Sequence, residues 1–413
     1  MAKPAPLSRH FTAARPRAMA ALTRYFRTVD LAEDAYQDAC MRAIKSWAHN
    51  GVPRDPTAWL ILVGRNAGID ALRRRETERT VVEGSGIEAD LGDVEADYAE
   101  AIDMSDYRDD VLRLLFMCCH DELSVQDQLA LALKVVVGFS VEEIARAFLV
   151  KPKSMEQRIT RAKKKAAVVA AALETPSPQE RAKRLNAVLV MLYLLFNEGY
   201  SSHGGADHIR HALCQEAIRL TRLLLQLFPA QPEVMGLLAL CLLHHARSFA
   251  RQDVSETLVP LDEQDRGLWD RSAIAEGQVL VEKALRRGSP GAFQIQAAIA
   301  AVHCAAPNAE ETDWSEIERL YRALEQVQPS PVVTLNRLVA ASKVSGAAEA
   351  LKGMESIAAD LQNYLYFHST RGALCAKLGE EAAAREAYEK ALMLGPSDAE
   401  RAYIRRRLSS LKK

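Results

Sequence analysis

Residues 31–75 have the sequence LAEDAYQDACMRAIKSWAHNGVPRDPTAWLILVGRNAGIDALRRR. Apolar residues recur at helical spacing as far as Trp47, which predicts a helix with one buried stripe. Asp30 precedes this helix and is a suitable N-cap. A turn-rich segment with two prolines follows, and either Asp55 or Thr57 can cap a second helix. The second helix ends in three consecutive arginines, so the stretch predicts two amphipathic helices, the second with a basic end.

The overall composition is that of a globular protein with several domains. The 413 residues are 49% hydrophobic and 26% charged, with a formal net charge of −1, so the chain as a whole lacks the charge excess of a simple nucleic-acid binder. Seven cysteines occur without a CxxC pair, which favours reduced thiols in a reducing compartment. No apolar run reaches the ~18 residues of a membrane span, and the N-terminus lacks the apolar core of a secretory signal. We therefore expect a cytoplasmic protein that does not contact a membrane.

Helical patterning continues along almost the whole chain, since runs of alternating β-branched residues are scarce. The expected fold class is all-α. Eight carboxylates and one arginine fall in residues 79–105, which predicts an acidic flexible linker. Charge and turn signals then divide the chain into residues 8–78, the linker 79–105, residues 106–172, and a long helical block at residues 180–413.

Residues 140–166 carry the pattern of a helix-turn-helix. Ser140 and Glu143 match a capping box at the start of a short helix. Ser154 is the expected N-cap of the next helix, whose exposed positions are rich in Lys and Arg. Basic and amide side chains on a recognition helix read base edges and phosphates in the major groove. The pattern therefore predicts DNA binding by this helix, although any amphipathic helix pair can carry a basic face.

These segments together resemble a known family. The order LAEDAYQDA, a Gly/Pro loop, AWL and RNAGIDALRRR looks like region 2 of the extracytoplasmic-function sigma factors, and EIARAFLVKPKSMEQRITRAKKK is similar to their region 4. The resemblance implies a bundle for region 2, a helix-turn-helix for region 4, and two partners, core RNA polymerase and promoter DNA. The β′ clamp helices and the β flap would be the polymerase contacts. Lys153 stands where the family usually has glycine.

The resemblance also implies roles for individual residues. The core-polymerase contacts would be Asp34, Gln37 and Asp38. The −10 DNA contacts would be Trp59, Arg65, Asn66, Asp70, Arg73 and Arg74. The −35 DNA contacts would be Lys151, Lys153, Ser154, Gln157, Arg158, Arg161 and Lys164. Without the resemblance, most of these are ordinary solvated positions on helices. The acidic linker has two interpretations, a segment in the RNA-exit path of polymerase or a soluble tether.

The C-terminal block has the texture of helical repeats. Gly372, Ala384, Tyr388, Ala391 and Pro396 match tetratricopeptide spacing, in which small residues let two helices cross closely and an aromatic ring fills the gap. Strings such as RLNAVLVMLYLLFNEGYS and CCHDEL are similar to group 42 of the extracytoplasmic-function sigma factors, which has a tetratricopeptide-like extension. The resemblance implies that residues 180–413 regulate the preceding domains in cis, and leaves open a regulatory protein partner.

No pattern predicts catalysis, a cofactor or a metal site. Cys118, Cys119 and His120 are adjacent, a spacing that suits packing better than one tetrahedral ion. His203, His208 and His211 could form a zinc site only if a Gly-Gly turn folded His203 back. There is no nucleophile–base arrangement and no phosphate-binding loop.

Two polar strings in the C-terminal block, residues 197–200 and 264–270, have two interpretations. Capping and buried hydrogen bonds are the simpler one, and a regulatory contact surface or small-ligand pocket is the other. Two other functions also stay open: a helix-turn-helix regulator with a ligand-sensing domain that never binds polymerase, and an all-α enzyme in the C-terminal block. The first helical pair argues against the regulator, because that function does not require it.

Overall fold

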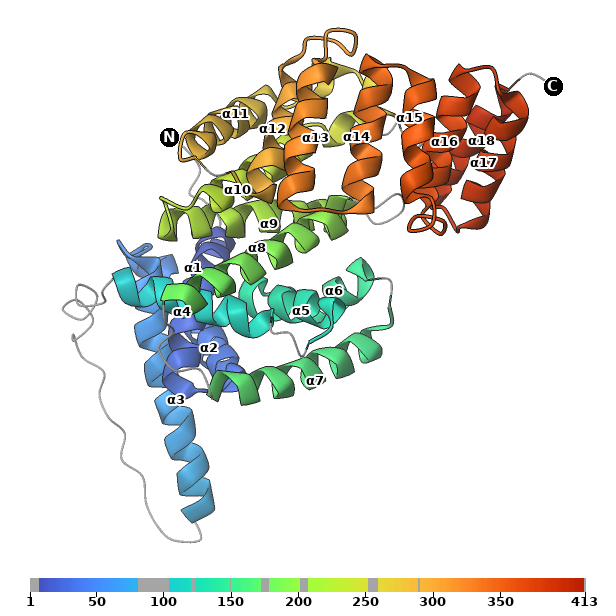
Figure 1. Ribbon diagram of the computed structural model, residues 1–413. Helices are drawn as coiled ribbons and strands as arrows, with labels where there is room; N and C mark the ends of the chain where they lie inside the picture. Colours follow the sequence, from blue (N-terminus) through green and yellow to red (C-terminus); the bar gives the residue numbers. More distant parts are fainter. Residues whose placement is uncertain are drawn as a thin grey trace. The chain divides into compact units, whose positions relative to one another are not determined.

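The computed structural model describes residues 7–80, 104–119, 123–148, 150–171, 178–200, 207–251, 259–288 and 290–411. These residues form helices joined by turns and contain no β-strand, which confirms the all-α fold class (Figure 1). The chain divides into two compact units, and the boundary between them lies within one helix. We refer to residues 1–194 as the first unit and residues 195–413 as the second unit. No helix in the described ranges is long and apolar enough to cross a membrane.

The first unit contains two groups of helices. Its helices are α1 (Leu7–Phe26), α2 (Val29–Asn50), α3 (Pro56–Thr80), α4 (Met104–Cys118), α5 (Val125–Ala132), α6 (Val141–Ala147), α7 (Pro152–Ala171) and most of α8 (Pro178–Tyr200). A π-helical turn, η2 (Leu133–Val137), extends α5 and ends at Gly138, whose φ of +94° lies in the left-handed region that favours glycine. Residues 81–103, most of the expected acidic linker, lie outside the described residues.

Helices α1, α2 and α3 pack against one another around buried Met19, Leu22, Ala35 and Leu60. The expected stripe on α2 is confirmed, because Ala35, Ala39, Ala43 and Trp47 are all buried. Small residues on α3 permit the close approach of α1, since a Cβ added at Gly68 would lie 2.3 Å from Cζ of Phe26. Packing between apolar faces therefore fixes which sides of α2 and α3 remain exposed.

Helices α5, α6 and α7 pack around buried Leu131, Ile144 and Met155. The capping box on α6 is confirmed: the backbone N–H of Glu143 donates to Oγ of Ser140 at 3.1 Å, and Ser140 N–H donates back to Oε2 of Glu143 at 2.7 Å. The two reciprocal bonds satisfy orphan donors at the start of the helix. They fix the turn between α5 and α6, against which α7 lies.

The second unit is a succession of packed helices. It contains α9 (Asp207–Leu227), α10 (Pro232–His245), α11 (Arg271–Leu285), α12 (Ala292–Ala305), α13 (Trp314–Val327), α14 (Pro331–Val344), α15 (Ala347–Met354), α16 (Leu365–Lys377), α17 (Glu381–Met393) and α18 (Asp398–Ser409). Short 3₁₀ turns join them: η3 (Ser248–Ala250), η4 (Leu261–Glu263), η5 (Arg266–Leu268) and η6 (Glu355–Ile357).

Close helix crossings hold the second unit together. A Cβ at Gly236 in α10 would lie 2.6 Å from the backbone nitrogen of Gln294 in α12, so only glycine fits this crossing. At the α16–α17 crossing, Gly372 faces the ring of Tyr388, and Ala384 is fully buried. The expected contact of a small residue with an aromatic ring is therefore present. The fit to a tetratricopeptide repeat itself stays a prediction.

Candidate polymerase and nucleic-acid interface

The polar face of α2 carries the residues expected to bind polymerase. Asp34 and Gln37 are exposed on the side away from the buried alanine stripe. Asp38 is half-buried and accepts from Nη2 of Arg42, one turn later, at 3.2 Å. An exposed i,i+4 pair of this kind contributes little to stability. The face is therefore polar, acidic and available to a partner.

Three cations are exposed along α3. Arg65 is exposed, and its guanidinium lies 4.4 Å from the ring centroid of Tyr25 in α1. Arg73 and Arg74 are exposed near the end of the helix, and Nε of Arg74 donates to the carbonyl of Asp70 at 3.3 Å. A guanidinium stacked on an aromatic ring suits phosphates and unstacked bases.

The other three expected −10 contacts are partly enclosed. Asn66 and Asp70 are half-buried in α3. Trp59 is also half-buried, with its ring 5.3 Å from that of Trp47 in an edge-on contact. Trp59 therefore joins the aromatic packing of the bundle and presents only part of its ring to solvent. At the start of the same helix, Oδ1 of Asp55 accepts from two backbone N–H groups, which decides between the two expected caps.

Helix α7 presents the basic surface of the helix-turn-helix. Its expected buried stripe is confirmed, since Met155, Ile159, Ala162 and Ala166 are buried. Of the expected −35 residues, six are exposed: Lys151, Lys153, Ser154, Gln157, Arg161 and Lys164. The expected −35 residues therefore share one solvent-facing surface, with Arg158 as the exception.

Arg158 is held by α5. Its Nη1 donates to Oε1 of Gln126 at 3.0 Å, and its Nε lies 3.6 Å from Oδ1 of Asp127. The side chain is partly buried. A guanidinium that is paired in this way can position a helix instead of binding a ligand. Sequence spacing alone did not show which of these two roles Arg158 has.

The expected N-cap role of Ser154 is wrong. Helix α7 begins at Pro152, and the carbonyl of Lys151 accepts from the backbone N–H groups of Ser154 and Met155 at 3.0 and 3.1 Å. Proline favours the first helical position because its φ is already helical and it has no N–H to leave unpaired. Ser154 therefore lies within the first turn with its hydroxyl at the surface.

Both groups of helices match models of known families. Residues 10–78 match Sigma-70 region 2, and residues 113–165 match Sigma-70, region 4. The chain belongs to the sigma-70 family. Residues 184–285 of this sigma factor match a family of unknown function, DUF6596. The exposed cations of α3 therefore lie in region 2, and those of α7 lie in region 4.

A bacterial relative matches nearly the full length of the sigma factor. An uncharacterized protein of Rhizobium meliloti (strain 1021) is 52% identical over 398 residues, covering 96% of this chain and 94% of the relative. No solved structure matches the chain. The helical block after region 4 is therefore shared with that relative.

The two sigma regions contact each other through a partly buried ion network. Nζ of Lys163 in α7 lies 2.7 Å from Oδ1 of Asp30 and 2.6 Å from Oε2 of Glu33, both in α2. The other oxygen of Glu33 binds Nη2 of Arg15 at 3.1 Å, and this nitrogen also donates to the carbonyl of Lys134 at 3.2 Å. We call these four side chains, Arg15, Asp30, Glu33 and Lys163, the inter-region network. It joins region 2 to region 4 across about 130 residues of sequence.

Charge balance explains why the network is stable. Glu33 is only 6% exposed, and its two oxygens face two different cations. Burial opposes the charge on Lys163, but hydrogen bonds to Asp30 and Glu33 outweigh it, and the pKa of Lys163 is raised. The expectation that Asp30 caps α2 is wrong, because α2 follows Thr28 and Asp30 lies within its first turn. Asp30 pairs with Lys163 instead.

The side chains considered for metal binding do not assemble a site in the described part of the chain. Cys118 and Cys119 are buried, and burial raises the pKa of the Cys118 thiol well above its usual value. The His211 ring packs on that of His245 at 4.6 Å. His120 and His203 and the side chain of His208 lie outside the described residues. Among the described residues, no group of three or more His, Cys, Asp or Glu could hold a metal ion.

Proposed function

We propose that this protein is a sigma factor of the extracytoplasmic-function type that directs promoter-specific transcription initiation. Its C-terminal extension would regulate this activity in cis. The single observation that carries the proposal is the presence of exposed cationic surfaces on α3 and α7, within the segments that match regions 2 and 4. Two separate cationic helices suit two separate stretches of one promoter. No enzymatic step is required of the chain itself.

Core polymerase would bind the polar face of α2. Asp34, Gln37 and Asp38 lie on one exposed or half-exposed surface, opposite a rigid alanine stripe. Carboxylates on a rigid helix suit a basic partner surface, and complementary charge raises the rate of association. These features support α2 as the docking helix for the β′ clamp.

The −10 element would be held open along α3. Arg65, fixed over the Tyr25 ring, and the pair Arg73 and Arg74 offer phosphate contacts along about two turns of helix. Partly exposed Trp59 offers a ring face near the start of the helix. Single-stranded DNA is bound by this combination of cations and aromatic faces.

The −35 element would be read by α7. Gln157, Arg161 and Lys164 are exposed on its outer surface, and glutamine and arginine make the specific base contacts in the major groove. Lys151 and Lys153, at the start of the helix, suit flanking phosphates. Arg158, held by Asp127, is expected to orient the helix and to reach DNA only by exchanging that partner.

In vitro transcription from a purified core polymerase tests the proposal. The full chain should support initiation from its own promoters, while a chain truncated near Glu174, after region 4, should differ in activity because the extension is absent. Equal activity of both forms would contradict cis regulation by the extension but not the sigma function. Failure of the full chain to bind core polymerase, with DNA binding retained, would favour the helix-turn-helix regulator instead.

A further inference from the structure

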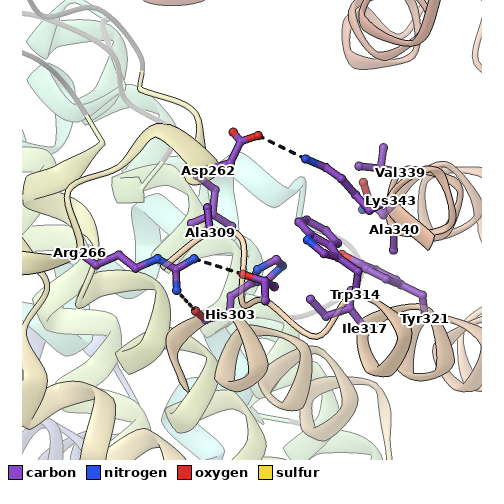
Figure 2. A pocket seen from close by; sticks show the side chains of 13 residues that line it. Asp262, Arg266, His303, Ala309, Trp314, Ile317, Tyr321, Val339, Ala340 and Lys343 are labelled. Atoms are coloured by element: carbon purple, nitrogen blue, oxygen red, sulfur yellow. Dashed lines mark hydrogen bonds and ion pairs between the residues drawn. The ribbon is translucent and has the colours of Figure 1, made fainter. Parts of the chain in front are cut away.

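The second unit contains a cavity of about 270 Å³ that the sigma function does not use (Figure 2). Its walls come from the turns η4 and η5, from the ends of α12 and α13 with the segment between them, and from one face of α14. Ligand pockets usually span ~300–1,000 Å³, so this one suits a small molecule with a single ring. All of its lining residues lie within the second unit.

One side of the cavity is aromatic and apolar. The indole of Trp314 lines it, and the ring of His303 meets that indole edge-on at 5.2 Å. Tyr321, Ile317 and Val339 complete this wall, as Figure 2 shows. An aromatic wall favours a planar ring, because stacked or edge-on aromatic pairs gain energy beyond the burial of their area.

The cavity also carries an excess of positive charge. Nζ of Lys343 lies 5.1 Å from the centroid of the Trp314 ring and 3.4 Å from Oδ2 of Asp262, which lies in η4. Arg266 is only 7% exposed, and its hydrogen bonds go to the carbonyls of His303 and Ala306 and to the hydroxyl of Thr312. Within the described residues, no carboxylate forms an ion pair with this guanidinium.

The neighbouring imidazole adds no charge to the cavity. Burial, together with the charges of Arg247 and Arg266, lowers the pKa of His303 to about 3, so the ring is neutral at physiological pH. The cavity therefore contains two cations, Arg266 and Lys343, and one carboxylate, Asp262. The exposure of Asp262, about half of its side chain, and its long 3.4 Å ion pair make it a weakly held partner for Lys343.

We propose that this cavity binds a small aromatic carboxylate, with its ring against Trp314 and its carboxylate on Lys343 in place of Asp262. The carboxylate of Asp262 shows that an anionic group can bind Lys343 at this position. The ligand would place its own carboxylate there and add an aromatic ring that Asp262 lacks. The buried charge of Arg266 favours an anion over a neutral ligand. This inference concerns the second unit alone and does not depend on the chain binding polymerase.

Displacement of Asp262 would act on more than the cavity. The adjacent Glu263, in the same turn, pairs with Arg406 at 3.3 Å and Arg407 at 3.1 Å, both in α18. Turn η4 thus ties α14, through Asp262 and Lys343, to the last helix. A ligand that takes Lys343 from Asp262 frees one of the two attachments of this turn, which gives the extension a means of responding to a metabolite.

Isothermal titration of the full chain with matched small probes tests the proposal. Phenylacetate should bind with a Kd below about 1 mM, while phenylacetamide, which has the same shape without the charge, should bind at least tenfold more weakly. Isovalerate, an anion without the ring, should also bind at least tenfold more weakly. No binding of phenylacetate, or equal binding of the amide, would overturn the proposal.

Two variants with opposite expected signs separate the proposed contact from a general loss of folding. Lys343→Met keeps the apolar stem and should weaken phenylacetate binding at least tenfold. Asp262→Asn removes the competing carboxylate and should strengthen it several-fold, an effect that structural damage does not produce. Lys390→Met, at an exposed lysine of α17, should leave binding unchanged. Weaker or unchanged binding in Asp262→Asn would contradict displacement, and unchanged binding in Lys343→Met would contradict the site.

Discussion

In the first unit, an ion network adds to the packing of α1 against α4 and η2 where region 2 meets region 4, whereas the closest helix crossings of the second unit rest on small and apolar side chains. In the inter-region network, Glu33 pairs with two cations, Arg15 and Lys163, and Lys163 also pairs with Asp30. The α16–α17 crossing instead buries the ring of Tyr388 against Gly372, and the α10–α12 crossing has backbone in contact with glycine. A charged side chain in an ion pair can exchange its partner for another charged group such as a phosphate. Opening close apolar packing instead costs a large free energy. The ion network is therefore the part of the contact between region 2 and region 4 that a charged partner can replace, while the close crossings of the second unit are rigid.

The largest expected loss of stability follows removal of an aromatic ring from the second unit. Tyr388→Ala should destabilise the fold by about 3–5 kcal/mol, because it opens a cavity at a fully buried crossing. Urea denaturation followed by circular dichroism measures the change. Met393→Ala, at a side chain that is 78% exposed in the same helix, should stay within about 0.5 kcal/mol of wild type. Equal effects of the two changes would contradict the apolar account of this unit.

Loss of the central carboxylate in the first unit should have the next largest effect. Glu33→Gln leaves Arg15 and Lys163 without their shared negative charge and should cost about 3 kcal/mol. The same measurement applies. Asp38→Asn, which breaks only the exposed pair with Arg42, should change stability by less than about 0.5 kcal/mol. A cost for Glu33→Gln as small as that of Asp38→Asn would show that the network does not hold the two regions together.

Promoter binding should depend on the exposed cations of α7. Arg158→Ala combined with Arg161→Ala should abolish promoter-specific transcription while core binding survives, because Arg161 is an exposed DNA contact worth ~1–3 kcal/mol and Arg158 orients α7 through Asp127. Arg161→Ala alone should weaken −35 binding about tenfold or more. Fluorescence anisotropy with a −35 duplex measures binding, and Lys390→Ala in the second unit is the control. Unchanged promoter use by the double variant would contradict the assignment of α7.

The stability of the second unit should depend on pH through His303. His303 has a folded-state pKa lowered to about 3, chiefly by burial, below the ~6.5 of an unfolded histidine. The unfolded chain therefore binds more protons between these values, and the second unit loses stability as the pH falls from about 6.5 toward 3. His303→Gln does not titrate, so its urea midpoint should fall less than that of wild type between pH 7 and 4. Parallel curves for the two proteins would remove His303 as the cause.

The sequence predicted what depends on neighbours along the chain. Alanine spacing on α2 and the stripe of Met155, Ile159 and Ala162 on α7 gave the correct buried faces, because helical periodicity decides them locally. The Ser140–Glu143 capping box was also correct, since both partners lie within one turn. These local rules also placed the expected polar faces of α2 and α3 at or near the surface.

Partners that are distant in sequence could not be predicted in this way. No pattern in α7 shows that Lys163 faces Glu33, 130 residues away, or that Arg158 is taken by Gln126 and Asp127. Both cations were indistinguishable in sequence from their exposed neighbours. Ser154 was wrongly expected to cap α7 because the preference of Pro152 for the first helical position is stronger.

The cavity in the second unit was only partly visible in the sequence. The polar string at residues 264–270 had two interpretations, and Arg266 makes the buried hydrogen bonds of the simpler one while also lining the cavity. Trp314 and Lys343 come from two later helices. Their approach to Arg266 is decided by helix packing, which residue spacing does not record.

The affinity of the purified full chain for core RNA polymerase is the most direct measurement of the central claim. Fluorescence anisotropy of the labelled chain should show saturable binding to core, and Asp38→Ala should weaken it because the polar face of α2 makes the contact. A chain that is folded by circular dichroism yet shows no saturable binding to core would contradict the account.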